Sequence, residues 1–196
     1  NTMFTWWKIS AKKNNVEYCQ NEVFSLGISD AGDQVTSVIL KSGDHLSGGK
    51  VVNAAGPYAA KISSMAGITL PVEPRKRYSF IFKAEKHLEK QLPLTIDPSG
   101  IHMRSDGENY LAGCPPDTDP AVNYEDFLFA HSLWESKVWP ILAHRVPKFE
   151  RIRLLNSWVG HYAYNTFDQN AILGFHSKIK NFVFANGFSG HGFQQS

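Results

Sequence analysis

Two glycine turns, each directly after an apolar strand, constrain the fold of this chain more than any other feature. The first turn, residues 54–56, follows the run "VVN", and the second, residues 187–192, follows "FVFAN". A backbone without side chains can approach a ligand closely, and ligands of open α/β sheets bind at the carboxyl ends of strands. We therefore expect the two turns to come together and to line one ligand site.

A purely structural explanation stays open for both turns. Glycine also serves tight strand-to-helix turns and terminal tails that bind nothing. The standard phosphate motifs are absent, since no G-x-G-x-x-G occurs and "GDHLSGGKV" misses the P-loop pattern. Around Ser189, His191 takes the place of the last glycine of G-x-S-x-G, so the pattern does not support a serine nucleophile.

Composition excludes several classes of protein. The 196 residues carry 20 Lys and Arg against 18 Asp and Glu, a formal charge of +2, so no strong field favours nucleic acid. No apolar run is long enough to span a membrane. Cys19 and Cys114 stand far apart without a Cys/His ladder, which argues against a metal site and favours a reducing compartment.

Hydrophobic spacing predicts a mixed α+β chain. Helical spacing covers residues 2–14, 56–67 and 127–142, and Pro140 is expected to kink or divide the last of these helices. Strand-like runs occupy the segments 16–28, 35–40, 50–55, 70–85, 92–116, 149–166 and 180–187.

Two strand segments contain polar and aromatic side chains whose environment the sequence leaves open. In "HYAYN", alternation puts His161, Ala163 and Asn165 on one face of the strand and Tyr162 and Tyr164 on the other. Either set is equally explained as ordinary residues at the edge of a core. The run "RKR" at 75–77 is expected to be a solvated strand entrance, with contact between one arginine and a substrate acid as the alternative.

Three ordered blocks resemble a known family. The blocks are "VVNAAGPYAAKISSMAGITLPVEPRKRYSFIF", "WVGHYAYNTFDQNAILGF" and "NFVFANGFSGHGFQ". Together they resemble the D-amino-acid-oxidase-like FAD-dependent oxidoreductases, which include the sarcosine and dimethylglycine enzymes. The resemblance covers most of the chain, and three blocks in order are more specific than any one of them.

The resemblance implies FAD as the cofactor and assigns residues to it. The first turn, Ala54, Ala55 and Gly56, resembles the family's turn beside the dinucleotide. The second turn resembles the loop that covers the isoalloxazine ring and donates backbone hydrogen bonds to its pyrimidine edge. This loop is formed by Gly187, Phe188, Ser189, Gly190, His191 and Gly192. Such donors stabilise negative charge on a reduced ring.

His161, Tyr162 and Gln194 are the candidate catalytic residues that the resemblance implies, and the chain departs from the family at two of them. His161 falls where monomeric sarcosine oxidases have a flavin-linked cysteine, so we expect noncovalent flavin. Gln194 stands where sarcosine oxidases have a lysine that holds the substrate carboxylate. Leu111 falls near the lysine that those oxidases use to activate oxygen, which favours a dehydrogenase, because superoxide formation needs a neighbouring cation.

The expected architecture is a remnant of an α/β FAD-binding domain over 1–70, a mixed, largely antiparallel substrate domain over 71–156, and a return to the FAD domain over 157–196. An amino-terminal Rossmann unit is expected to be missing.

The expected reaction is oxidation of a C–N bond in a small amine or N-methyl amino acid, with an electron-acceptor protein as partner. The alternative is a flavoprotein scaffold that binds respiratory-complex subunits during assembly of mitochondrial complex I. The mitochondrial location rests on the resemblance alone.

Overall fold

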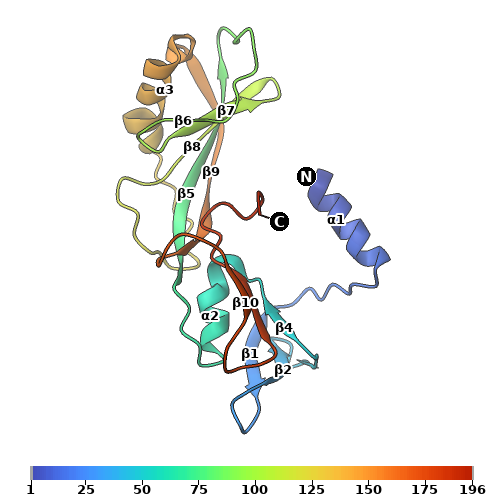
Figure 1. The fold of residues 1–196 in the computed structure, drawn as a ribbon. Coiled ribbons are helices and arrows are strands. Elements are labelled where there is room, and N and C mark those ends of the chain that lie inside the picture. The colour runs from blue at the N-terminus through green and yellow to red at the C-terminus, as the bar shows by residue number, and fades with distance from the viewer. Residues whose placement is uncertain (1, 196) are drawn as a thin grey trace.

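The computed structural model describes residues 2–195, which form two lobes joined by a long strand pair (Figure 1). In chain order the elements are α1 (Thr2–Lys13), β1 (Val23–Ile28), β2 (Val35–Leu40), β3 (His45–Leu46), β4 (Val51–Asn53), η1 (Gly56–Tyr58), α2 (Ala59–Ser64), β5 (Val72–Ala84), β6 (Thr95–Ile96), β7 (His102–Asp106), β8 (Asn109–Cys114), η2 (Trp134–Val138), α3 (Trp139–Arg145), η3 (Pro147–Glu150), β9 (Ile152–Asn165), β10 (Ile172–Phe175) and β11 (Phe182–Asn186). The mixed helix and strand content with antiparallel sheets agrees with the α+β prediction.

The larger lobe is built on the antiparallel pair β5 and β9. Their register runs from Val72 opposite Asn165 to Ala84 opposite Ile152, inside a five-stranded sheet of order β6-β7-β8-β5-β9. Burial alternates along β5 with the two-residue period of a strand that has one covered face. Phe80 and Phe82 are fully buried on that face and pack against the Trp134 ring. This aromatic core fixes which face of the sheet the helices η2 and α3 cover.

The smaller lobe contains a three-stranded sheet of order β10-β11-β4 and a three-stranded sheet of order β1-β2-β3. β11 pairs with β4 in parallel, with Phe182 opposite Val51 and Phe184 opposite Asn53. One face of this sheet packs on α2 through Ala59. The smaller lobe therefore joins residues near 50 to residues near 185 through one parallel pair.

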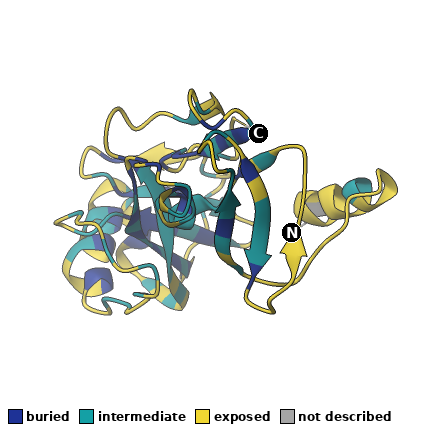
Figure 2. Ribbon diagram, turned by 90° about the horizontal axis from the view of Figure 1, so that it is seen from below, coloured by how far each residue is buried: buried dark blue, intermediate teal, exposed yellow. Residues whose placement is uncertain are grey.

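Several apolar side chains of the smaller lobe and of α1 are exposed. Val52, Leu173 and Phe175 are 58%, 66% and 59% exposed on their sheet. Helix α1 stands apart from the lobes in Figure 1 and is largely exposed in Figure 2. Its Trp7 meets the ring of Phe193 at 6.1 Å between centroids. No helix within residues 2–195 is long and apolar enough to cross a membrane.

Three predictions from spacing need correction. The helix expected from residue 127 begins only at Trp134, because residues 123–128 form a loop tied to β5 and β9. The expected division of this helix near Pro140 is confirmed, since the π-helical turn η2 ends at Val138 and Pro140 lies in the first turn of α3, where its missing N–H costs nothing. The segment 16–19 forms no strand, and β10 was not predicted. The long strands over 72–84 and 152–165 are confirmed.

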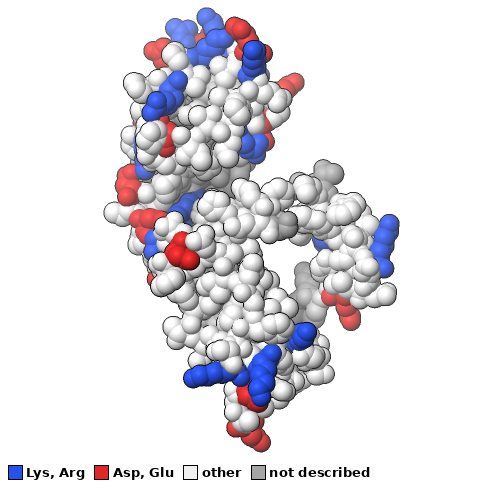
Figure 3. Space-filling view, in the orientation of Figure 1, with Lys and Arg blue, Asp and Glu red and all other residues white. Residues whose placement is uncertain are grey.

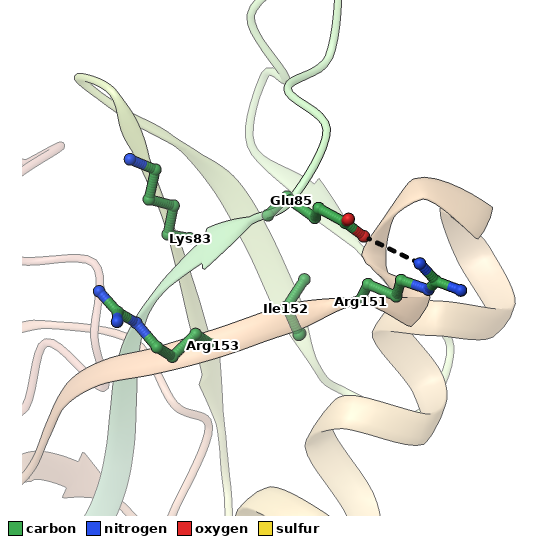
Figure 4. A pocket seen from close by; sticks show the side chains of 6 residues that line it. Lys83, Glu85, Arg151, Ile152 and Arg153 are labelled. Atoms are coloured by element: carbon green, nitrogen blue, oxygen red, sulfur yellow. Dashed lines mark hydrogen bonds and ion pairs between the residues drawn. The ribbon is translucent and has the colours of Figure 1, made fainter.

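Two cations face each other at the far end of the β5–β9 pair. Lys83 lies directly opposite Arg153, and neither has an ion-pair partner among the residues that the structure describes. Figure 4 shows both side chains pointing away from the Glu85–Arg151 ion pair, around a hollow of about 480 Å³. Like charges directly opposite on two strands destabilise a sheet.

Arg153→Glu is predicted to raise the free energy of unfolding by about 0.5–1 kcal/mol, because it replaces this repulsion with a cross-strand ion pair. Urea denaturation of the two proteins measures the change. Lys178→Glu is the matched control, since Lys178 is exposed and has no ion-pair partner in the described part of the chain. An equal gain in both variants would contradict a specific cross-strand effect.

Candidate functional site

The two glycine turns meet at one edge of the sheet β10-β11-β4 in the smaller lobe. Strands β4 and β11 are parallel neighbours, so their carboxyl ends lie side by side. The first turn, Ala54 to Gly56, leaves β4, and the second, Gly187 to Gly192, leaves β11. The structure therefore brings together the two segments that the sequence singles out. Flavin contact by these residues stays a prediction.

Asn53 fixes the shape of the first turn. The side-chain Nδ2 of Asn53 donates to the Ala59 carbonyl at 2.9 Å and to Ser63 Oγ at 3.0 Å, while its Oδ1 accepts from the Ala55 N–H. Gly56 adopts φ of 56°, the left-handed region that favours glycine. The buried asparagine thus ties β4, the turn and α2 into one unit.

The first turn is also tied to the larger lobe. The Tyr58 hydroxyl donates to Glu125 Oε1 at 2.5 Å, and the Tyr58 ring stacks on Tyr124 at 4.8 Å. This hydrogen bond to a carboxylate raises the pKa of Tyr58 above its ordinary value. The loop 123–128 therefore holds the first turn from the side of the larger sheet.

Ser189 anchors the second turn to β9. Its N–H donates to the Ala163 carbonyl at 3.0 Å, and its Oγ accepts from the Asn165 N–H at 2.9 Å. Asn165 in turn donates through Nδ2 to Asp168 Oδ1 at 2.8 Å. Ser189 is 8% exposed and holds φ of 50°. These contacts give the serine a structural role and agree with the absence of a nucleophile motif.

Tyr162 packs against Gly190. A Cβ placed on Gly190 would lie 2.3 Å from Cε2 of Tyr162, well inside van der Waals contact, and Gly190 has φ of 97°. Both steric space and backbone conformation therefore require glycine at this position. Of the candidate catalytic residues, Tyr162 is the one that the fold places directly on the glycine loop.

His161 and Gln194 lie elsewhere. His161 points to the opposite side of β9 from Tyr162, as the predicted alternation requires, and stacks on Phe127 at 4.3 Å. Its Nε2 lies 2.9 Å from the Asp126 carbonyl oxygen, which only accepts, so Nε2 carries the proton. Gln194 is exposed two residues beyond Gly192. The catalytic roles of these residues stay predictions.

The interpretation of residues 75–77 as a solvated strand entrance is wrong. Lys76 is 9% exposed and donates to Asp126 Oδ1 at 2.6 Å. That contact keeps the pKa of Asp126 below its ordinary value. Arg77 is forked onto Asp119, with Nη1 and Nη2 at 2.7 and 2.8 Å from the two carboxylate oxygens. Asp119 and Asp126 belong to a loop that is far from residues 75–77 in the sequence. Their carboxylates compensate the charges of Arg77 and Lys76, so these side chains can be shielded from solvent.

A hollow of about 520 Å³ opens beside Tyr162 on the larger sheet. Its lining includes Arg77, Tyr164, His102 and Cys114. Burial lowers the pKa of His102 and raises that of Cys114 to about 11, so the Cys114 thiol stays protonated near neutral pH. The hollow can hold a small molecule beside Tyr162, and Cys114 offers no nucleophile to it. No cluster of three or more His, Cys, Asp or Glu suited to a metal ion occurs within residues 2–195.

The glycine loop suits an acceptor-rich planar ligand. Neither the Gly190 nor the Gly192 N–H reaches a backbone acceptor among the described residues. At the start of the loop, Asn186 is fully buried and its side-chain nitrogen and oxygen have no partner. Unpaired buried amides are rare, so they indicate a binding function or a missing contact. In Figure 3 the centre of this face is largely uncharged, and charged side chains lie at the two ends, along the left edge and on α1. These features fit a flavin ring.

Residues 3–196 match the family described as FAD dependent oxidoreductase (DAO), and the chain belongs to this family. FAD is the family's cofactor, which confirms the predicted resemblance. The Xenopus laevis FAD-dependent oxidoreductase domain-containing protein 1 is 42% identical over 159 residues, 74% of this chain and 32% of that protein. The Bos taurus protein of the same name is 40% identical over 159 residues, 74% of this chain and 33% of its own length. The chain thus spans about a third of these relatives.

Solved structures share the fold. L-proline dehydrogenase from P. horikoshii superposes with a TM-score of 0.75 at 26% identity, over 88% of this chain and 45% of that one. Glycine oxidase from Geobacillus kaustophilus gives 0.72 at 22% identity, over 89% and 45% of the two chains. The second likeness concerns the fold alone. A missing Rossmann unit and the domain boundaries at 70 and 156 stay predictions.

Gly190→Ala is predicted to destabilise the protein more than Gly174→Ala. Both positions have positive φ, 97° and 123°, so each alanine costs about 1–3 kcal/mol in backbone strain. Only the Gly190 methyl group meets an obstacle, the Tyr162 ring, and overpacking adds about 1–3 kcal/mol. Denaturant unfolding measures both losses. Equal losses would mean that Tyr162 does not pack on the loop.

Proposed function

We propose that the protein oxidises a C–N bond of a small amine or N-methyl amino acid and passes the electrons to an acceptor other than oxygen. Bound FAD supplies the hydride-accepting chemistry, and the protein holds the ring and places the substrate. The observation that carries the proposal is the glycine loop: within the described residues the Gly190 and Gly192 N–H groups reach no backbone acceptor, and Gly190 packs against Tyr162, which lines the 520 Å³ hollow.

The substrate class is supported by the size and lining of the hollow and by the names of the structural neighbours. A volume of about 520 Å³ accommodates a molecule of amino-acid size. The neighbours named above are a dehydrogenase of L-proline and an oxidase of glycine. Both substrates are small and carry an oxidisable carbon beside nitrogen.

The preference for a dehydrogenase rests on which cations are free. Leu111 lies on β8, opposite Ile81 and Arg104, and offers no charge. Lys76 is bound by Asp126 and Arg77 by Asp119, so both charges are compensated. A flavin beside Lys76 and Arg77 would therefore meet cations already neutralised by carboxylates, which weakens their ability to stabilise superoxide.

A scaffold function in mitochondrial complex I assembly is the second candidate. The observation in its favour is α1, whose Met3, Phe4 and Trp6 are 53%, 65% and 63% exposed and form an apolar helix surface. Exposed apolar patches mark protein interaction sites. Both candidate functions are compatible with a mitochondrial location, which is part of the proposal.

The test uses the full-length protein with FAD, kept without oxygen. Sarcosine, dimethylglycine, L-proline and D-amino acids are added in turn, and the visible flavin bands are followed. Bleaching by one of these amines, with slow reoxidation by air, is the expected result. A yellow protein that none of them bleaches would favour the scaffold, whereas reoxidation as fast as turnover would make it an oxidase.

Gln194→Lys sharpens the test. If Gln194 faces the substrate acid, the added ammonium group lowers KM for carboxylate substrates by about tenfold, the effect of one charge-assisted hydrogen bond, and leaves the matching amides unchanged. Gln195→Lys adds the same charge one residue away and serves as the control. Equal effects of both variants would remove Gln194 from the substrate site.

A further inference from the structure

Arginine and tyrosine side chains form a ladder across β5 and β9. The Arg75 guanidinium lies 3.9 Å from the ring centroid of Tyr164, and the Arg77 guanidinium lies 4.7 Å from that of Tyr162. Stacking of a guanidinium on an aromatic face is favourable, and more so when water is excluded. The arginine side chains are only 19% and 18% exposed, so the ladder is mostly shielded from solvent.

Asp119 holds both arginines of the ladder. Its carboxylate accepts the two-point contact from Arg77 and lies 3.5 Å from Nη1 of Arg75. The bidentate geometry fixes the plane of the Arg77 guanidinium, and a lysine ammonium could not reproduce that plane. Because the fork is already filled, Arg77 is a poor counter-ion for a substrate acid. The planar Arg77 guanidinium instead gives the Tyr162 ring a flat surface on which to stack.

Tyr162 connects the fixed guanidinium of Arg77 to the glycine loop. One face of its ring meets Arg77, and its edge meets Gly190 so closely that no Cβ fits between them. The contacts thus run in series from Asp119 through Arg77 and Tyr162 to Gly190. They connect a loop of the larger lobe to the turn that follows β11.

We propose that Asp119 is a positioning residue for the glycine loop. By fixing Arg77, it holds the Tyr162 ring in the place that determines where the Gly190 amide lies. The effect on FAD rests on the proposed function, whereas the effect on the loop itself does not.

The experiment compares Asp119→Asn with Asp117→Asn in the full-length protein. Asp117 is the matched control, since it pairs with Lys137 at 2.8 Å beside the same hollow but touches neither arginine of the ladder. Arg77→Lys keeps the charge and loses the planar fork, so it should behave like Asp119→Asn. Hydrogen exchange of the amides at 187–194 is measured with and without FAD, together with the Kd for FAD.

In Asp119→Asn and Arg77→Lys, the hydrogen-bonded loop amides of Ser189 and His191 are expected to exchange about tenfold faster while the core strands β5 and β8 keep their protection. The Kd for FAD is expected to rise by about tenfold, and Asp117→Asn should match the wild type in both measurements. Unchanged loop exchange in Asp119→Asn and Arg77→Lys, or equal acceleration across the whole protein, would overturn the proposal. Faster loop exchange in a protein that binds no FAD would uphold the positioning and instead refute the proposed cofactor role.

Discussion

The parallel pairing of β4 with β11 is the constraint on which the rest of the structure depends. Three residue pairs, from Phe182 opposite Val51 to Phe184 opposite Asn53, join segments about 130 positions apart in the chain. A shift of register by one residue would turn Phe182 and Phe184 out of the core. The same shift would move the glycine turn after β11 away from the turn after β4, and the two would no longer form one site.

The larger lobe holds the two glycine turns in place through hydrogen bonds that the β4–β11 pair does not provide. Strand β9 returns to the glycine loop and holds it through Asn165 and the Ala163 carbonyl, while the loop 123–128 holds Tyr58, two residues after the first turn. Each glycine turn is thus fixed from two sides, once by its own sheet and once by the larger one. Such support keeps backbone donors in place before a ligand arrives, which is what preorganised binding requires.

The sequence predicts those parts of the site that depend on local chemistry. Strand periodicity locates β5 and β9, and the clustered glycines locate the turn after β11, whereas the packing of Tyr162 against Gly190 is visible only in the structure. The pairing of Arg77 with Asp119 spans 42 positions and leaves no local signal, so the run "RKR" alone wrongly predicts a solvent-exposed segment at 75–77. Phe127 has helical spacing with later aromatic residues, yet its loop is drawn to His161. Tertiary contacts override local preference at these places.

The most direct test of the account is a crystal structure of the full-length protein with FAD. The account predicts the isoalloxazine ring between the two glycine turns, with its pyrimidine edge accepting hydrogen bonds from the backbone of the loop 187–192. A flavin ring bound away from both turns, or a loop 187–192 whose amides all bond to protein acceptors, would contradict it.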